Sequence, residues 1–162
     1  METTLFYLLA AVAIVATVLA IIEKHPVHAI VYLVTSFFSL AVIFYLLSAP
    51  LIAMFEVIIY AGAVMVLFMF VIMMLDLGRP EEARRPALRQ WLLPLLLGGI
   101  ILLSIAALAA TPSRAPALAH VVSVREFAVT LFSRYGVAIE IISMQLLFAV
   151  VGALYLGRRR RP

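Results

Sequence analysis

Apolar residues occur in five long runs, and short polar or proline-containing segments separate them. The runs predict helices at roughly residues 3–22, 27–48, 51–77, 91–110 and 136–156. Each has about the 20 residues that a helix needs to cross a hydrocarbon core of about 30 Å. We therefore expect an all-α integral membrane protein with five transmembrane helices in a single membrane domain, residues 1–162.

The segment between the fourth and fifth runs has a different pattern. Apolar side chains return there at Val121, Val124, Ala128, Leu131 and Phe132, which is the i, i+3, i+4 spacing of one helical face. A helix with polar residues on its other face lies in the plane of the membrane interface. The sequence thus predicts a short amphipathic helix at the outer interface.

Composition agrees with a membrane protein. Hydrophobic residues make up 67% of the chain and charged residues 12%, whereas a soluble domain has about half and about a quarter. The chain has no cysteine, so it cannot hold a disulfide, an iron–sulfur cluster or a thiolate metal site. Most basic residues gather in the segment 78–90 and the tail 158–161, which flank predicted spans. That distribution is typical of membrane topology and argues against nucleic-acid binding.

Lysine and arginine counts predict the orientation of the spans. The first loop, the third loop and the C-terminus share one side, which carries nine of these residues. The other side carries three, namely Arg114, Arg125 and Arg134. Because cytoplasmic segments carry the excess of positive charge, we expect the C-terminus in the cytoplasm and the N-terminus outside. The expected location is a bacterial inner membrane, crossed several times.

Two carboxylates lie clearly inside predicted spans, Glu56 and Glu140, whereas Asp76 lies at the end of the third span. A charged side chain at the centre of a membrane helix costs about 2.5–3.5 kcal/mol and often marks an ion path. Glu56 and Glu140 each lie only four or five positions from the outer end of their helix, which is roughly 6–8 Å at 1.5 Å per residue. A carboxylate at that depth also reaches the headgroups. A proton path and an interfacial anchor therefore remain open as interpretations.

A phenol and three small residues follow the first of these acids: Tyr60, Ala61, Gly62 and Ala63. In an α-helix Tyr60 is the i+4 neighbour of Glu56, so the phenol and the carboxylate share one face. The phenol can relay hydrogen bonds from the acid through water. The small residues admit another backbone or a file of water, and Gly62 eases a departure from i→i−4 bonding such as a π-bulge. The alternative is a small-residue packing seam beside a snorkelling acid.

Three stretches carry a resemblance to a known family. The most specific is EVIIYAGAVMVLFMFVIMMLDLG (Glu56–Gly78), and the others are HPVHAIVYLV (His25–Val34) and FAVTLFSRYGVAIEIISMQLL (Phe127–Leu147). They resemble subunit J of bacterial NADH–quinone oxidoreductase, respiratory complex I, whose mitochondrial counterpart is NADH dehydrogenase subunit 6. The resemblance covers nearly the whole chain, and residues 79–90 and 111–120 match least.

The resemblance implies that the third span is a gate. In this family the third helix is associated with a π-bulge that can rotate or relax to α-helix, opening a water path beside carboxylates of the small subunit K. Carried over to this sequence, Tyr60 and Gly62 become the gate and the hinge, with Ala61 and Ala63 in the hinge.

The resemblance also implies which side chains line the path. Bulky residues that block or open it would be Val64, Met65 and Phe68, with Glu56 and Glu140 in supporting proton or water roles. Expected partners are the K subunit, the quinone-site H subunit, the neighbouring A and N subunits and the lipid bilayer. Quinone, FMN and iron–sulfur clusters would belong to other subunits, and this chain would hold no redox centre.

Two other functions are weighed against the gate. One is a purely structural scaffold in this complex or in a related membrane oxidoreductase or hydrogenase. The other is a free-standing transporter, for which an inverted repeat or a pair of interrupted helices is the usual sign. The sequence has neither, so a subunit of a larger complex is the favoured interpretation.

Overall fold

The structure is a computed structural model that describes residues 2–74, 88–110 and 122–157. Contacts divide the chain into two units, Met1–Val121 and Val122–Pro162. In the described ranges the regular structure is helical throughout, and five helices are long and apolar enough to cross a membrane. The predicted fold class is confirmed. Most of the basic residues on which the predicted orientation rests lie outside the described residues, so the orientation and the single membrane domain stay predictions.

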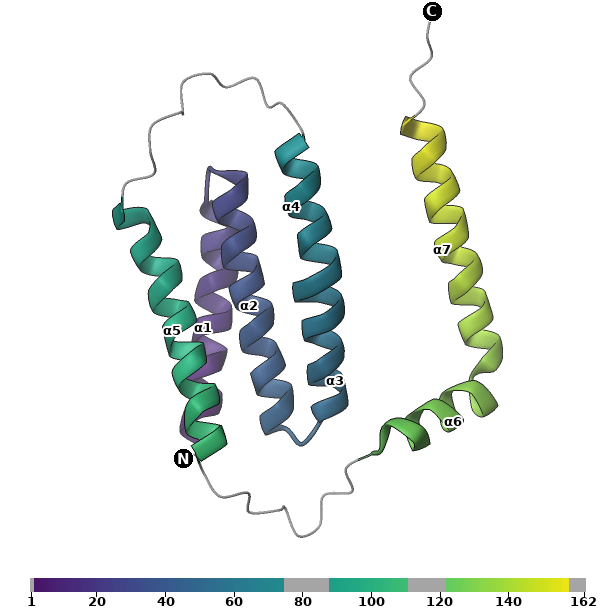
Figure 1. The fold of residues 1–162 in the computed structure, drawn as a ribbon, viewed down its shortest axis with the longest axis horizontal. Coiled ribbons are helices and arrows are strands. Elements are labelled where there is room, and N and C mark those ends of the chain that lie inside the picture. The colour runs from purple at the N-terminus through teal and green to yellow at the C-terminus, as the bar shows by residue number, and fades with distance from the viewer. Residues whose placement is uncertain (1, 75–87, 111–121, 158–162) are drawn as a thin grey trace, which may run out of the picture. The chain divides into compact units, whose positions relative to one another are not determined.

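The first unit contains four of the five spans. Its helices are α1 (Glu2–Ile22), α2 (Pro26–Leu46), α3 (Pro50–Phe55), η1 (Glu56–Val64), α4 (Met65–Met74) and α5 (Leu88–Ala110). The elements α3, η1 and α4 follow one another without a break and form one span (Figure 1). In this unit α2 is the central helix, with α1 and α5 on one side and the α3–η1–α4 span on the other. The contacts of η1 and α4 with the rest of the unit run mainly to α2.

Hydroxyl groups fasten α2 to α1. The fully buried Ser39 donates from Oγ to the carbonyl oxygen of Leu9 at 2.7 Å. One turn earlier, Ser36 Oγ lies 2.8 Å from Thr17 Oγ1 and donates to the carbonyl oxygen of Ala13 at 3.2 Å. Small polar residues of this kind hold membrane helices together, because their hydroxyls have no water to bond inside the bilayer. The α1–α2 pair is therefore the firmly joined part of the unit.

The turn from α2 to α3 is short and closed by hydrogen bonds. Helix α2 ends at Leu46, two residues before the predicted 48, because Ser48 adopts a left-handed φ of 62°. The N–H of Ala49 bonds to the carbonyl of Phe44, and that of Ser48 bonds to the carbonyl of Tyr45. This is the Schellman arrangement, which usually has glycine where Ser48 stands. Pro50 then begins α3, where a missing N–H costs nothing.

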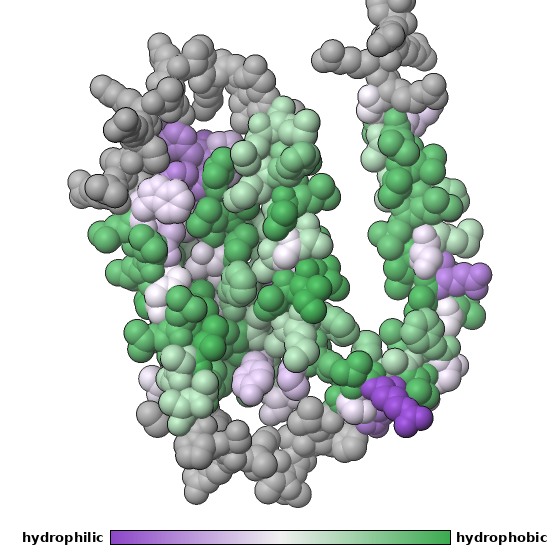
Figure 2. Space-filling model, viewed as in Figure 1, coloured by the Kyte–Doolittle hydropathy of each residue, from purple (hydrophilic) through white to green (hydrophobic). Residues whose placement is uncertain are grey.

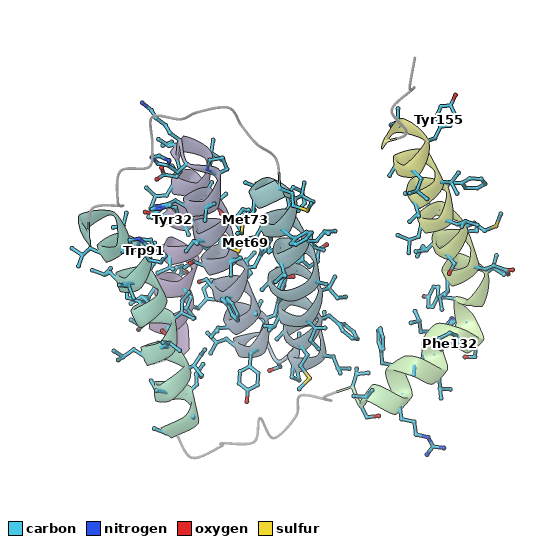
Figure 3. The ribbon with its side chains drawn as sticks, turned by 45° about the horizontal axis from the view of Figure 1, so that its top comes forward. Tyr32, Met69, Met73, Trp91, Phe132 and Tyr155 are labelled. Atoms are coloured by element: carbon cyan, nitrogen blue, oxygen red, sulfur yellow. The ribbon has the colours of Figure 1, made fainter. Side chains whose placement is uncertain are left out.

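Helix α5 completes the packing of the first unit. Its Leu97 and Ile101 join the buried apolar cluster of α1 and α2. At its beginning Trp91 lies against His28 of α2, with ring centroids 5.7 Å apart (Figure 3). Among the described residues no group of three or more His, Cys, Asp and Glu side chains forms a metal-binding cluster.

The second unit contains α6 (Val124–Arg134) and α7 (Gly136–Gly157). Helix α6 is the short amphipathic helix that the sequence predicts, and Val121 of the expected face lies outside the described residues. No residue of α7 is buried within its unit. On the face that Figure 2 shows, hydrophobic residues make up most of the surface of the helices in each unit, as contact with lipid or with other apolar helices requires.

Candidate functional site

The third span changes its hydrogen bonding midway along its length. Residues Glu56–Val64 form a π-helix of nine residues between the α-helical segments α3 and α4. At its end the N–H of Met65 bonds to the carbonyl of Tyr60, five residues earlier, as well as to that of Gly62. π-Helices are rare and frequently lie at functional sites. This segment contains the acid, the phenol and the small residues that the sequence singles out.

Gly62 allows a close approach inside the π-helix. A Cβ atom built on Gly62 would lie 3.2 Å from the carbonyl oxygen of Val57. Val57 is five positions earlier, which is the partner position of i→i−5 bonding. Since most real Cβ atoms stay farther from such an oxygen, any larger residue at position 62 would press on the carbonyl. Glycine at position 62 therefore avoids a tight contact with this carbonyl.

The π-helix keeps the inward-facing residues of the third span in one line. Ala53, Ala61 and Met65 are buried, and Val57 and Met69 are half-buried, so every fourth residue faces inward. In an α-helix a four-residue step advances the face by about 40°, and the line would wind around the helix. Bonding to the fifth residue lengthens the turn and reverses that drift. The π-helix thus keeps one line of side chains against α2, and Figure 3 shows Met69 on that side.

Tyr60 lies beside this line and contacts α2 through its ring. It is 49% exposed, and its ring centroid lies 5.4 Å from that of Phe37, with the planes inclined at 43°. The expected alignment of Tyr60 above Glu56 assumes α-helical geometry. A four-residue step also stays close to one face in the π-helix, although Glu56 is half-buried and Tyr60 is exposed.

Phe37 is the contact that sequence reasoning missed. It is half-buried on α2 between Ser36 and Ser39, which fasten that helix to α1. Nothing in a wholly apolar helix distinguishes Phe37 from its neighbour Phe38, because lipid-facing and packed aromatic residues look alike in sequence. A sequence signal exists only in the adjacent serines, which mark the buried side of α2.

The other expected site residues lie on different faces of the same span. Val64 is half-buried, Met65 is buried and contacts the interior, and Ala63 and Phe68 are exposed, Phe68 at 54%. The structure therefore brings the predicted gate residues together along one span and separates them around its circumference. Their functional roles stay predictions.

Glu140 belongs to the second unit. It is an exposed residue in the first turns of α7, and the nearby Ser143 donates from Oγ to the carbonyl of Ile139 at 3.0 Å. That bond occupies the hydroxyl within its own helix. A role for Glu140 in proton movement stays a prediction.

Comparison with known proteins identifies the family. Residues 5–156 match the family described as NADH-ubiquinone/plastoquinone oxidoreductase chain 6. NADH-quinone oxidoreductase subunit J of Pseudomonas aeruginosa is 39% identical over 160 residues, which are 95% of this chain and 95% of that protein. Subunit J of Escherichia coli strain K12 is 38% identical over 159 residues, covering 96% and 86%. Subunit J of Buchnera aphidicola subsp. Schizaphis graminum is 32% identical over 159 residues, covering 96% and 98%.

These relatives confirm the resemblance drawn from the sequence. Together with the five apolar spanning helices, the bacterial relatives also confirm the expected location, a bacterial inner membrane crossed several times. The chain belongs to the family of NADH-ubiquinone/plastoquinone oxidoreductase chain 6.

Proposed function

We propose that this chain is a membrane-arm subunit of a proton-pumping NADH–quinone oxidoreductase, in which a change of helical register in η1 gates a proton or water path. The observation that carries the proposal is the nine-residue π-helix in the middle of a membrane span. Such a segment can return to α-helix without breaking the chain, since only the partners of its backbone hydrogen bonds change.

The register change would exchange the side chains that face α2. An α-helix turns by 100° per residue, so with Ala53 fixed the residues 7, 11 and 15 positions later fall within about 60° of its face. These residues are Tyr60, Val64 and Phe68. With the same rotation of 100° per residue, Met65, which is buried in the π form, would lie about 120° away from the side that faces α2.

The exchange replaces small or flexible side chains by rigid ones. The π form places Ala61 and Met65 against α2, whereas the α form would place Tyr60 and Phe68 there. Two aromatic rings fill space that an alanine and an unbranched thioether leave adaptable. Gly62 and its neighbours Ala61 and Ala63 act as the hinge, because they are the residues that tolerate both backbone patterns most easily. The register thus controls how much room lies between this span and its neighbours.

Supporting roles go to the two membrane acids. Glu56 begins the π-helix and is half-buried, so a change of register alters its surroundings directly. Glu140 would exchange protons or order water from α7. Expected partners are the K, H, A and N subunits, and quinone, FMN and iron–sulfur clusters belong to other subunits of the complex. In the proposed orientation the N-terminus is outside and the C-terminus is cytoplasmic.

A structural scaffold is the alternative function. The observation in its favour is the hydroxyl-bonded α1–α2 pair, which is built for firm packing. A scaffold needs no change of register in η1. The two functions therefore predict different behaviour of the third span during turnover.

Cysteine labelling of the assembled complex distinguishes the two functions. The chain has no cysteine of its own, so Met65→Cys and Phe68→Cys each give one reactive position in it. The gate predicts that labelling of Met65→Cys rises during turnover with NADH and quinone, while labelling of Phe68→Cys falls. Leu97→Cys, at a buried position of α5, is the control and should not change. Identical labelling at rest and during turnover, in variants that still pump protons, would favour the scaffold.

A further inference from the structure

Helix α6 separates apolar from polar residues around its axis. At 100° per residue, five apolar side chains occupy one continuous arc of about 140°. In order around the helix they are Phe127, Leu131, Val124, Ala128 and Phe132. These residues are exposed or half-exposed within their unit. The arc is wide enough to enter the acyl region of a bilayer while the opposite side stays in water.

Two arginines mark the borders of this arc. At 100° per residue, Arg125 lies about 20° beyond Phe132 at one end of the arc. Arg134 lies about 20° beyond Phe127 at the other end. They are nine residues apart, which is about 14 Å along the axis. Both are exposed, and neither has an ion-pair partner among the described residues. Arginines in this position bury their aliphatic stems beside the apolar face and raise the guanidinium groups to the headgroups.

The connection to α7 fixes the depth of α6. Only Tyr135 lies between Arg134 and Gly136, the first residue of the span α7. Tyr135 donates its N–H to the carbonyl of Leu131 at 3.0 Å and accepts at its carbonyl from Ile139 N–H at 3.1 Å. The corner is therefore bonded to both helices, and α6 turns away from the axis of α7 there (Figure 1). Since α7 starts at the membrane boundary, α6 starts from that boundary too.

The other end of α6 is also fixed. Ser123 caps the helix, because its Oγ accepts from the N–H of Glu126 at 3.1 Å and its carbonyl accepts from the N–H of Phe127. Capping of this kind stabilises the first turn. The first turn of α6 is thus closed by hydrogen bonds, and the helix places both arginines at set positions along its axis.

We propose that α6 binds anionic phospholipid, with Arg125 and Arg134 each contacting a headgroup phosphate and the apolar arc lying among the acyl chains. Charge selects the lipid, since two positive groups at the level of the phosphates attract lipids with a net negative headgroup more than zwitterionic ones. One basic side chain at the membrane surface accounts for about a fivefold preference, so two give about thirtyfold. This binding is independent of the register of η1.

Quenching by brominated lipids tests the site in the full chain. Ala128→Cys provides the only cysteine in the chain, within the apolar arc, for a fluorescent label. The labelled chain is reconstituted in vesicles that contain brominated phosphatidylglycerol or brominated phosphatidylcholine in an otherwise equal lipid mixture. Relative quenching by the two lipids should show that α6 prefers phosphatidylglycerol about thirtyfold. The double substitution of Arg125→Gln with Arg134→Gln should reduce this preference to near equality.

Two further variants test whether the charge at positions 125 and 134 determines the lipid preference, rather than the net charge of the chain. Arg125→Lys with Arg134→Lys keeps both charges and should retain most of the preference. Lys24→Gln removes an exposed positive charge from the α1–α2 turn and should leave it unchanged. Equal quenching by both lipids in the unaltered background would overturn the proposal. Absence of quenching by either lipid would overturn it as well, since α6 would then be covered by protein.

Discussion

Adding one methyl group at Gly62 should shift the register of the third span. The new Cβ of Gly62→Ala would lie 3.2 Å from the carbonyl oxygen of Val57, which is five residues earlier and faces position 62 in the π-helical register. Alanine also favours any helix over glycine by about 1 kcal/mol, but this term is the same for both registers. Overpacking by one carbon typically costs about 1–3 kcal/mol. The contact is mild, so we expect about 1 kcal/mol, which is about a fivefold shift of the equilibrium toward the α form.

The measurement is the number of protons moved per NADH oxidised by the complex in sealed vesicles. We expect Gly62→Ala to lower this ratio and Gly62→Leu to lower it further, with normal assembly in both. Gly98→Ala is the matched control, because a Cβ there meets no atom within 4 Å apart from the nearby backbone of its own helix, and the glycine lies in another span, α5. If Gly62→Ala and Gly98→Ala pump equally well, the contact with Val57 has no part in coupling and the register argument is wrong.

Three more predictions concern the surroundings of η1. Phe37→Leu removes a ring contact with Tyr60 worth about 0.5–1.5 kcal/mol and should alter the proton-to-NADH ratio, whereas Phe38→Leu should not; equal effects would refute a special role for Phe37. Glu56→Gln removes an exchangeable charge at the start of the π-helix, so proton transfer should slow; pumping that is unchanged at every pH would make the acid an interfacial anchor. Ser39→Ala removes the buried bond to α1 and should destabilise the chain by about 0.6 kcal/mol, measured by unfolding in detergent.

The spans of this fold could be predicted because membrane thickness sets them. Any helix that crosses the bilayer needs about 20 apolar residues, whatever it packs against. The end of α2 could not be placed in the same way, since the left-handed φ of Ser48 depends on the turn to α3 and not on a glycine or asparagine in the sequence. Hydropathy thus predicts which segments cross the membrane, whereas local hydrogen bonds determine the residue at which each helix ends.

The candidate site was predictable only in part, for a related reason. A helix that is apolar on every side gives no periodic signal for the face that packs, so the inward line through Ala61 and Met65 could not be read from the sequence. Gly62 was identifiable because a glycine amid bulky residues needs a reason. The alignment of Glu56 with Tyr60 stays a prediction, because the sequence does not reveal the i→i−5 bonding that changes the rotation per residue in this segment.

The closed turn after α2 has a consequence for the direction in which movement can travel. Only Leu47, Ser48 and Ala49 separate α2 from α3, and their backbone hydrogen bonds tie the beginning of the third span to a helix already fastened to α1. The upstream end of that span therefore cannot rotate freely. Any turn gained or lost in η1 must appear as rotation of α4 and of whatever partner contacts it. A symmetric hinge would divide the motion between both ends, whereas the hinge proposed here would transmit it along the chain in a single direction.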